Sequence, residues 1–72
     1  MINAQDEAIQ LLDVVALLDA LPEQGLERGQ VGTIVEEWKP GVYEVEFQDS
    51  RSGKTVASVT VDAPRLMKLR HA

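Results

Sequence analysis

The alternating stretch at residues 42–48 constrains this 72-residue chain more than any other feature. Successive side chains of a strand point to opposite faces, so Glu44 and Glu46 share one face. The opposite face is aromatic and aliphatic, with Tyr43, Val45 and Phe47. A turn at residues 39–41 and a run rich in β-branched residues at 31–38 precede this strand. The pattern predicts a β-hairpin with its aromatic face buried and its glutamates toward water or a partner.

The chain beyond this hairpin also reads as short strands. Residues 54–61 alternate after a polar loop and predict a strand with Thr55, Ala57, Val59 and Val61 on one side. Residues 62–66 are too few for an α-helix, but Asp62 can cap a single 3₁₀ turn in which Pro64 fits the first positions. Residues 67–70 then form a last short strand.

Residues 11–18 are compatible with two structures. Apolar residues recur there at helical spacing, and the segment is rich in Leu and Ala. A short buried strand over residues 12–17 is the alternative, and we favour it because a barrel needs a further strand to cover its edge. Periodicity alone does not separate the helix from the strand.

Glycines and scattered apolar residues complete the expected core. Gly32 lies inside a strand and predicts a bulge or a sharp bend. Leu26, between Gly25 and Gly29, is expected to anchor a loop on the core. The expected core residues are Val14, Leu17, Leu26, Val31, Val35, Tyr43, Val45, Phe47, Val59 and Leu66.

Composition excludes several classes of site. The chain has no cysteine and one histidine, which excludes disulfides, thiolate metal sites and histidine-rich zinc sites. We expect no metal and no cofactor. A domain this small without such cross-links often gains stability by oligomerising, so a homo-oligomer is expected.

The net charge of −5 is unevenly divided along the chain. Residues 1–50 carry eleven acidic groups against Arg28 and Lys39, a net of −9, whereas residues 51–72 carry Asp62 against five basic groups, a net of +4. The overall negative field disfavours nucleic acid, whose affinity for proteins depends on phosphate neutralisation. No signal peptide and no apolar run long enough for a membrane span is apparent, so we expect a cytoplasmic protein without membrane contact.

Five short strands with a 3₁₀ turn before the last form the plan of an all-β, SH3-like barrel over residues 11–72, preceded by an N-terminal arm at residues 1–10. The motifs LDVV (12–15), GL (25–26), GQVGTIVE (29–36), YEVEF (43–47) and APRL (63–66) together resemble a bacterial family of small proteins of unknown function. Members of such families are often encoded near toxin–antitoxin genes or integron cassettes. The resemblance implies a non-enzymatic barrel with a protein-binding, adaptor or antitoxin-like role, and it carries over no catalytic residue.

The expected partner-binding residues lie around the hairpin: Trp38, Tyr43, Glu44, Glu46 and Glu36. SH3-like barrels bind extended peptides across aromatic surfaces, and tryptophan is enriched at interface hot spots. The alternative is that Trp38 caps the barrel and Tyr43 belongs to the core. Self-association through exchange of the N-terminal arm is a further expectation.

Two other functions are weaker alternatives. Arg65, Lys68 and Arg70 form a small basic patch that would suit a KOW-like nucleic-acid-binding barrel. An enzyme is disfavoured, because His71 is penultimate and no serine has the surroundings of a nucleophile. The acidic stripe of Glu44 and Glu46 is expected wherever an alternating strand has its other face in a core.

Overall fold

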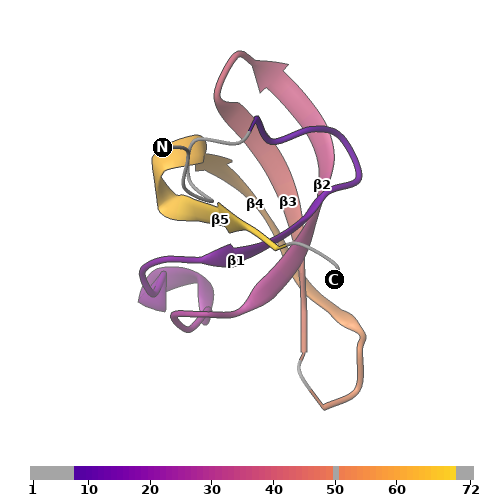
Figure 1. Ribbon diagram of the computed structural model, residues 1–72. Helices are drawn as coiled ribbons and strands as arrows, with labels where there is room; N and C mark the ends of the chain where they lie inside the picture. Colours follow the sequence, from indigo (N-terminus) through magenta and orange to yellow (C-terminus); the bar gives the residue numbers. More distant parts are fainter. Residues whose placement is uncertain (1–7, 50, 70–72) are drawn as a thin grey trace.

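The computed structural model describes residues 8–49 and 51–69, and this part of the chain is all-β (Figure 1). Its strands are β1 (Val14–Leu17), β2 (Val31–Lys39), β3 (Val42–Gln48), β4 (Thr55–Asp62) and β5 (Leu66–Lys68). Two 3₁₀ turns connect them, η2 (Pro22–Gln24) after β1 and η3 (Ala63–Arg65) before β5. The predicted SH3-like barrel with a 3₁₀ turn before its last strand is confirmed.

The strands form one antiparallel sheet in the order β4-β3-β2-β1-β5. The long β2–β3 hairpin dominates the molecule, and the shorter β1 and β5 lie across one end of it (Figure 1). In β1, Val15 pairs with Gly32 on one side and with Lys68 on the other. The strand expected within residues 11–18 is therefore confirmed, and the helical alternative is wrong, because pairing on both edges outweighs local helix propensity.

The β2–β3 hairpin turns at Pro40 and Gly41, and Gly41 has a φ of 81°. This angle suits the third position of a type II turn, where glycine is favoured. Irregularities in the pairing fall between Ile34 and Glu36 and between Glu37 and Lys39. The expectation of a bulge at Gly32 is wrong.

Gly32 instead allows two chain segments to approach closely. It pairs regularly with Val15 and with Phe47. A Cβ atom at this position would lie 2.7 Å from Val45 Cγ1, 2.8 Å from the main-chain oxygen of Glu46 and 2.9 Å from Phe47 Cδ1. Atoms of β3 and its core side chains therefore occupy the space that a side chain at residue 32 would need.

The core fills the inner face of the sheet. Its buried apolar residues are Val15, Ala16, Leu17, Leu21, Leu26, Ile34, Tyr43, Val45, Phe47, Val61 and Leu66. Six of the ten expected core residues are among them, Leu26 included. The expectation is wrong for Val31, which is exposed, and Val14, Val35 and Val59 are only half-buried. In β2 the inner face carries Gly32 and Ile34, so the alternation runs one residue out of phase with the expected one.

The last part of the chain follows the predicted pattern with three exceptions. An extra residue at Val56 puts Thr55, which is exposed, out of phase with the predicted inner face, and β5 begins at Leu66 rather than at residue 67. Ala57, Val59 and Val61 of β4 face inward, while Val56, Ser58 and Thr60 are exposed. Pro64 lies in the first positions of η3, as expected. Asp62 precedes this turn, but its side chain makes no capping hydrogen bond, so the predicted cap is wrong.

Candidate protein-interaction surface

Six residues from β2, β3 and β4 bring an indole, three carboxylates and two hydroxyls together on the outer face of the sheet. We call this the Trp38 surface, and it comprises Glu36, Trp38, Glu44, Glu46, Ser58 and Thr60. The pairing aligns Glu36 with Glu44 on one side of β3, and Glu44 with Thr60 on the other. Cross-strand partners share a face, so these side chains lie over the same patch of sheet.

Glu44 is the centre of this arrangement. Its Oε1 accepts hydrogen bonds from Trp38 Nε1 at 3.1 Å and from Thr60 Oγ1 at 2.8 Å, and its Oε2 accepts one from Ser58 Oγ at 2.7 Å. Three donors from two neighbouring strands therefore fix one carboxylate. Hydrogen bonds to an ionised acceptor are the stronger kind, which makes Glu44 the anchor of the surface.

The titration of Glu44 reflects these bonds. The hydrogen bond from Ser58 lowers the pKa of Glu44 below its ordinary value, and the bonds from Thr60 and Trp38 act in the same direction, while partial burial opposes them. Donors to the charged form stabilise it. The carboxylate is thus held ionised at neutral pH.

Trp38 is presented to solvent rather than folded into the core. It lies at the irregularity between Glu37 and Lys39, where β2 has an extra residue relative to β3. A bulge of this kind redirects a side chain. The Trp38 side chain is 61 % exposed, while its indole N–H is held by Glu44. The indole is therefore both accessible and fixed in orientation.

Tyr43, which the sequence places beside Trp38, lies on the other side of the sheet. It is 5 % exposed and belongs to the core, so the hypothesis that its ring joins Trp38 at a binding surface needs correction. Alternation separates them, because Tyr43 shares its face with Val45 and Phe47. The Tyr43 hydroxyl donates to the main-chain oxygen of Ile9 at 3.2 Å, which ties the segment before β1 to the core. Burial raises the pKa of Tyr43, and the charges of Glu37 and Asp13 raise it further.

The remaining predicted site residues lie on the outer face. Glu36 and Glu46 are exposed, and each lies near Glu44, from across the hairpin or along β3. Together with Glu44 they make this face of the hairpin acidic. Within residues 8–49 and 51–69, no group of three or more potential metal-ligating side chains is placed to hold a metal ion.

The predicted basic patch is partly neutralised in the structure. Lys68 Nζ lies 3.1 Å from Asp13 Oδ2, so this cation has an acidic partner across the β1–β5 pair. Arg65 is exposed at the end of η3. Arg70 and His71 lie outside the described residues. The described part of the patch is therefore weaker than the sequence suggested.

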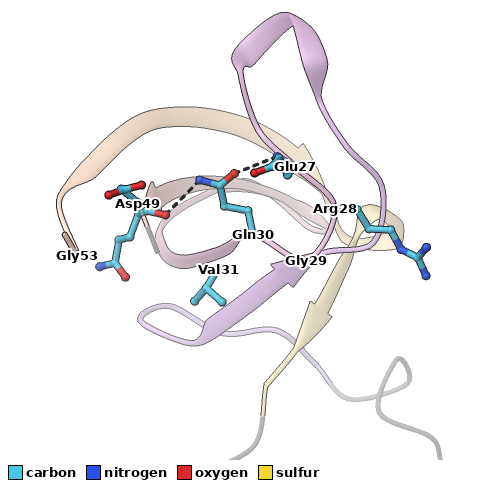
Figure 2. A pocket seen from close by; sticks show the side chains of 8 residues that line it. Glu27, Arg28, Gly29, Gln30, Val31, Asp49 and Gly53 are labelled. Atoms are coloured by element: carbon cyan, nitrogen blue, oxygen red, sulfur yellow. Dashed lines mark hydrogen bonds between the residues drawn. The ribbon is translucent and has the colours of Figure 1, made fainter. Parts of the chain in front are cut away.

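A pocket of about 550 Å³ opens beside the start of β2, and sequence reasoning missed it (Figure 2). Gln30 spans it: its Oε1 accepts from the Glu27 amide at 2.9 Å, and its Nε2 donates to the Gln48 main-chain oxygen at 3.1 Å. Both ends of the Gln30 amide are thus engaged in holding a loop to β3. The Arg28 guanidinium points away from this amide (Figure 2). No sequence motif predicts this pocket, because only the pairing of strands in the sheet brings Gln30 close to Gln48.

The turn before β1 carries two exposed leucines that the sequence had not identified as special. Leu12 donates to the Ile34 oxygen at 2.8 Å, while the Ile34 amide donates to the Asp13 oxygen at 2.9 Å. Two residues directly before β1, Leu12 and Asp13, thus oppose a single residue of β2, and Leu12 has a φ of 72°. This is a G1-type bulge, whose first position is ordinarily glycine. Leu12 occupies it with a side chain that is 71 % exposed.

These features define the class: a small, all-β domain of the SH3-like barrel type with an aromatic and acidic outer face. The chain belongs to the family described as Domain of unknown function (DUF4926), which matches residues 11–68. The expected resemblance to a family of unknown function is thereby confirmed. No curated protein and no solved structure matches the chain. Across the described residues, none of the helical segments has the length and apolar character that a membrane span requires.

Proposed function

We propose that this protein is a non-catalytic protein-interaction module that binds its partner through the Trp38 surface. The observation that carries the proposal is the Trp38 side chain, 61 % exposed yet fixed by the Glu44 carboxylate. An ordered, exposed indole loses little conformational freedom on binding and offers a large contact area, as interface hot spots do.

The charges around the indole indicate the chemistry of the partner. Glu36 lies opposite Glu44 and Glu46 lies two residues further along β3, and both are exposed, whereas Glu44 is already committed to three donors. A lysine or arginine of the partner can lie over the indole and pair with one of the free carboxylates. The surface therefore suits a basic segment of another protein, in keeping with an adaptor-like or antitoxin-like role.

The test is a comparison of captured partners. The tagged chain and its Trp38→Ala variant would be used as baits in lysate of the source cell, with and without nuclease, and read by mass spectrometry. We expect a protein partner that resists nuclease and is lost with Trp38→Ala. A matched control is Leu11→Ala, which removes another exposed large side chain, 55 % exposed, from a different part of the surface.

Each outcome bears on the proposal. Equal loss of the partner with both variants would indicate a general effect on the fold and contradict a specific role for Trp38. Partners that disappear with nuclease would instead support the hypothesis of a KOW-like nucleic-acid-binding barrel. Nucleic-acid binding that weakens steeply with salt would confirm that hypothesis. Retention of the partner by Trp38→Ala would assign recognition to another surface.

A further inference from the structure

The outer edge of β4 is open over a short regular stretch. The strand order places β4 at the end of the sheet, where it pairs only with β3 among the described residues. Its pairing is regular from Asp62 to Ala57, and an extra residue at Val56 ends this regularity. Bulges are one way in which proteins blunt a sheet edge, so the open part runs over residues 57–62. This stretch reads ASVTVD and contains no proline and a single charge, at Asp62.

The main-chain groups that point away from β3 belong to Ser58, Thr60 and Asp62. The Ala63 amide donates to the Gly41 oxygen at 2.8 Å, so the main-chain groups of Ala63 point toward β3. Main-chain groups of successive residues alternate between the two edges of a regular strand. Those of the odd-numbered residues therefore point toward β3, and those of the even-numbered residues are left for another strand.

The outer face of the sheet beside this edge is acidic. Ser58 and Thr60 hold the Glu44 carboxylate there, while Glu46 and Asp62 are exposed. Neither β3 nor β4 contains a lysine or an arginine. A second copy of the open stretch would bring a further carboxylate and no cation to this face, which disfavours it as the neighbour. A strand with basic side chains on this face is the complementary neighbour.

The inner face beside the same edge is apolar and incompletely covered. Ala57 and Val59 pack against the core, yet both are half-buried, whereas Val61 further along β4 is buried. Apolar side chains on the inner face of an added strand would remove more of this surface from water. Successive side chains of a strand alternate between faces, so a segment in which basic and apolar residues alternate suits both faces of the edge.

We propose that the partner of the Trp38 surface adds an antiparallel strand to the edge of β4, with basic residues opposite Ser58, Thr60 and Asp62 and apolar residues between them. This inference rests on the proposed function and specifies its partner as an extended segment that alternates lysine or arginine with apolar residues. The antiparallel direction continues that of the described strand pairs and gives the more stable ladder. In such strand addition, main-chain bonds supply affinity and alternate side chains supply specificity.

The added strand brings a cation within reach of the indole. Trp38 Nε1 and Thr60 Oγ1 both donate to Glu44 Oε1, at 3.1 and 2.8 Å, so one carboxylate oxygen joins the indole to β4. An added strand lies about 5 Å beyond β4. A long basic side chain opposite Thr60 can therefore lean across β4 toward Glu44 and the indole, where cation–π attraction is available.

The first test uses the wild-type chain and the capped synthetic peptide Gly-Lys-Val-Lys-Val-Lys-Gly, with binding followed by NMR titration of the protein amides. Residues opposite each other in a hydrogen-bonded antiparallel pair exchange both main-chain bonds and share a face. The lysine amides of the bound peptide therefore point toward β4, and the valine amides point away. Two derivatives are compared, one N-methylated at two of the lysines and one at both valines, so their charge and their number of methyl groups are equal.

We expect the unmodified peptide to bind with a Kd below about 1 mM and to shift the amides of Ser58 and Thr60 most strongly. Methylation of the valines should change the affinity by less than about threefold, whereas methylation of the lysines should weaken it at least about tenfold, because it removes main-chain bonds to β4. Equal affinities of the two derivatives, or no binding of the unmodified peptide, would overturn pairing along the edge. Loss of a captured partner with Trp38→Ala would still support the proposed function in that case, so the two failures are distinguishable.

The second test applies the same geometry to the partner captured from lysate. Ser58→Pro removes an outward amide, and proline is tolerated in an edge strand where its nitrogen faces away from the sheet. Ser58→Ala is the matched control, because both variants remove the hydroxyl bond to Glu44 and only proline also removes the amide. With both chains shown to be folded by circular dichroism, Ser58→Pro should lose the partner at least about tenfold more than Ser58→Ala. Retention of the partner by folded Ser58→Pro would overturn the proposed pairing, and if Ser58→Pro does not fold, the peptide comparison decides.

Discussion

Gly32→Ala tests whether the close approach of β2 and β3 depends on a missing side chain. The new methyl group would point to the inner face, toward Val45 and Phe47, which are both fully buried. All three of its nearest atoms would lie at 2.7–2.9 Å, well inside the 3.4 Å at which ordinary contacts begin. One of them is a main-chain oxygen of Glu46, which moves only if β3 moves.

The expected cost follows from two opposing terms. Forcing extra volume into a packed core costs roughly 1–3 kcal/mol. Replacing glycine by alanine restricts the unfolded chain and returns about 0.4–1 kcal/mol. Because a main-chain atom is among the contacts, we expect the upper part of the first range and a net loss of about 2 kcal/mol. In a domain of this size that lowers Tm by about 8–16 °C.

Urea unfolding monitored by far-UV circular dichroism measures this loss as a shift of the midpoint at constant slope. Val45→Ala, introduced together with Gly32→Ala, removes the nearest of the three contacts. The double variant should therefore lose less stability than the sum of the two single variants, by about 0.5–1 kcal/mol. A Gly32→Ala chain within about 0.5 kcal/mol of the wild type would refute the argument from close approach.

Three further predictions concern single side chains. Since the pKa of Glu44 is lowered on folding, ionised Glu44 contributes to stability above its ordinary pKa, and this contribution is lost as the pH falls toward the folded pKa. Glu44→Gln should therefore show a smaller loss of Tm between about pH 5 and 3 than the wild type. Equal losses of Tm in the two chains would contradict the stabilising role of the carboxylate. Leu12→Gly should leave the free energy of unfolding unchanged or raise it by up to about 1 kcal/mol, because relief of left-handed backbone strain outweighs the greater unfolded-state entropy of glycine. Leu11→Gly is the control, and urea unfolding measures both variants. A larger loss of unfolding free energy for Leu12→Gly than for Leu11→Gly would contradict the presence of strain at Leu12. Tyr43→Phe removes the bond to Ile9 and should cost about 0.5–1.5 kcal/mol at pH 7. Because the pKa of Tyr43 is raised on folding, its contribution to stability is present below the ordinary pKa and is lost as the pH rises through the raised pKa of the folded state. This variant should therefore lose less stability than the wild type above about pH 10.

The predicted surface shows how far sequence reasoning reached toward the site. Alternation in β3 was enough to place Glu44 and Glu46 on the outer face, and the structure puts Glu36 and Trp38 beside them. The role of Glu44 as an acceptor for donors on β4 was not foreseen. Ser58 and Thr60 are fourteen and sixteen positions away in sequence, and only the register of β3 with β4 brings them to the carboxylate.

The errors in the expected core have the same origin. In β2, the sequence Val31-Gly32-Thr33-Ile34-Val35 has apolar residues on both faces, so alternation alone does not select the buried one. Pairing with β1 and β3 on either side determines which face of β2 is buried. These neighbours accommodate the Ile34 side chain, whereas β3 leaves no space for a side chain at Gly32.

The sequence by itself determined most of the architecture of the protein: the strands after residue 30, their main turns, the 3₁₀ turn before β5 and the buried face of β3 and β4. These features depend on local periodicity and on turn chemistry, which neighbouring residues carry. The tertiary structure alone decided which face of β2 is buried, that residues 14–17 form a strand, and which groups surround Glu44 and Gln30. Such outcomes depend on register and packing between strands that are distant in sequence. A one-residue shift in register moves every side chain of the shifted strand to the opposite face of the sheet.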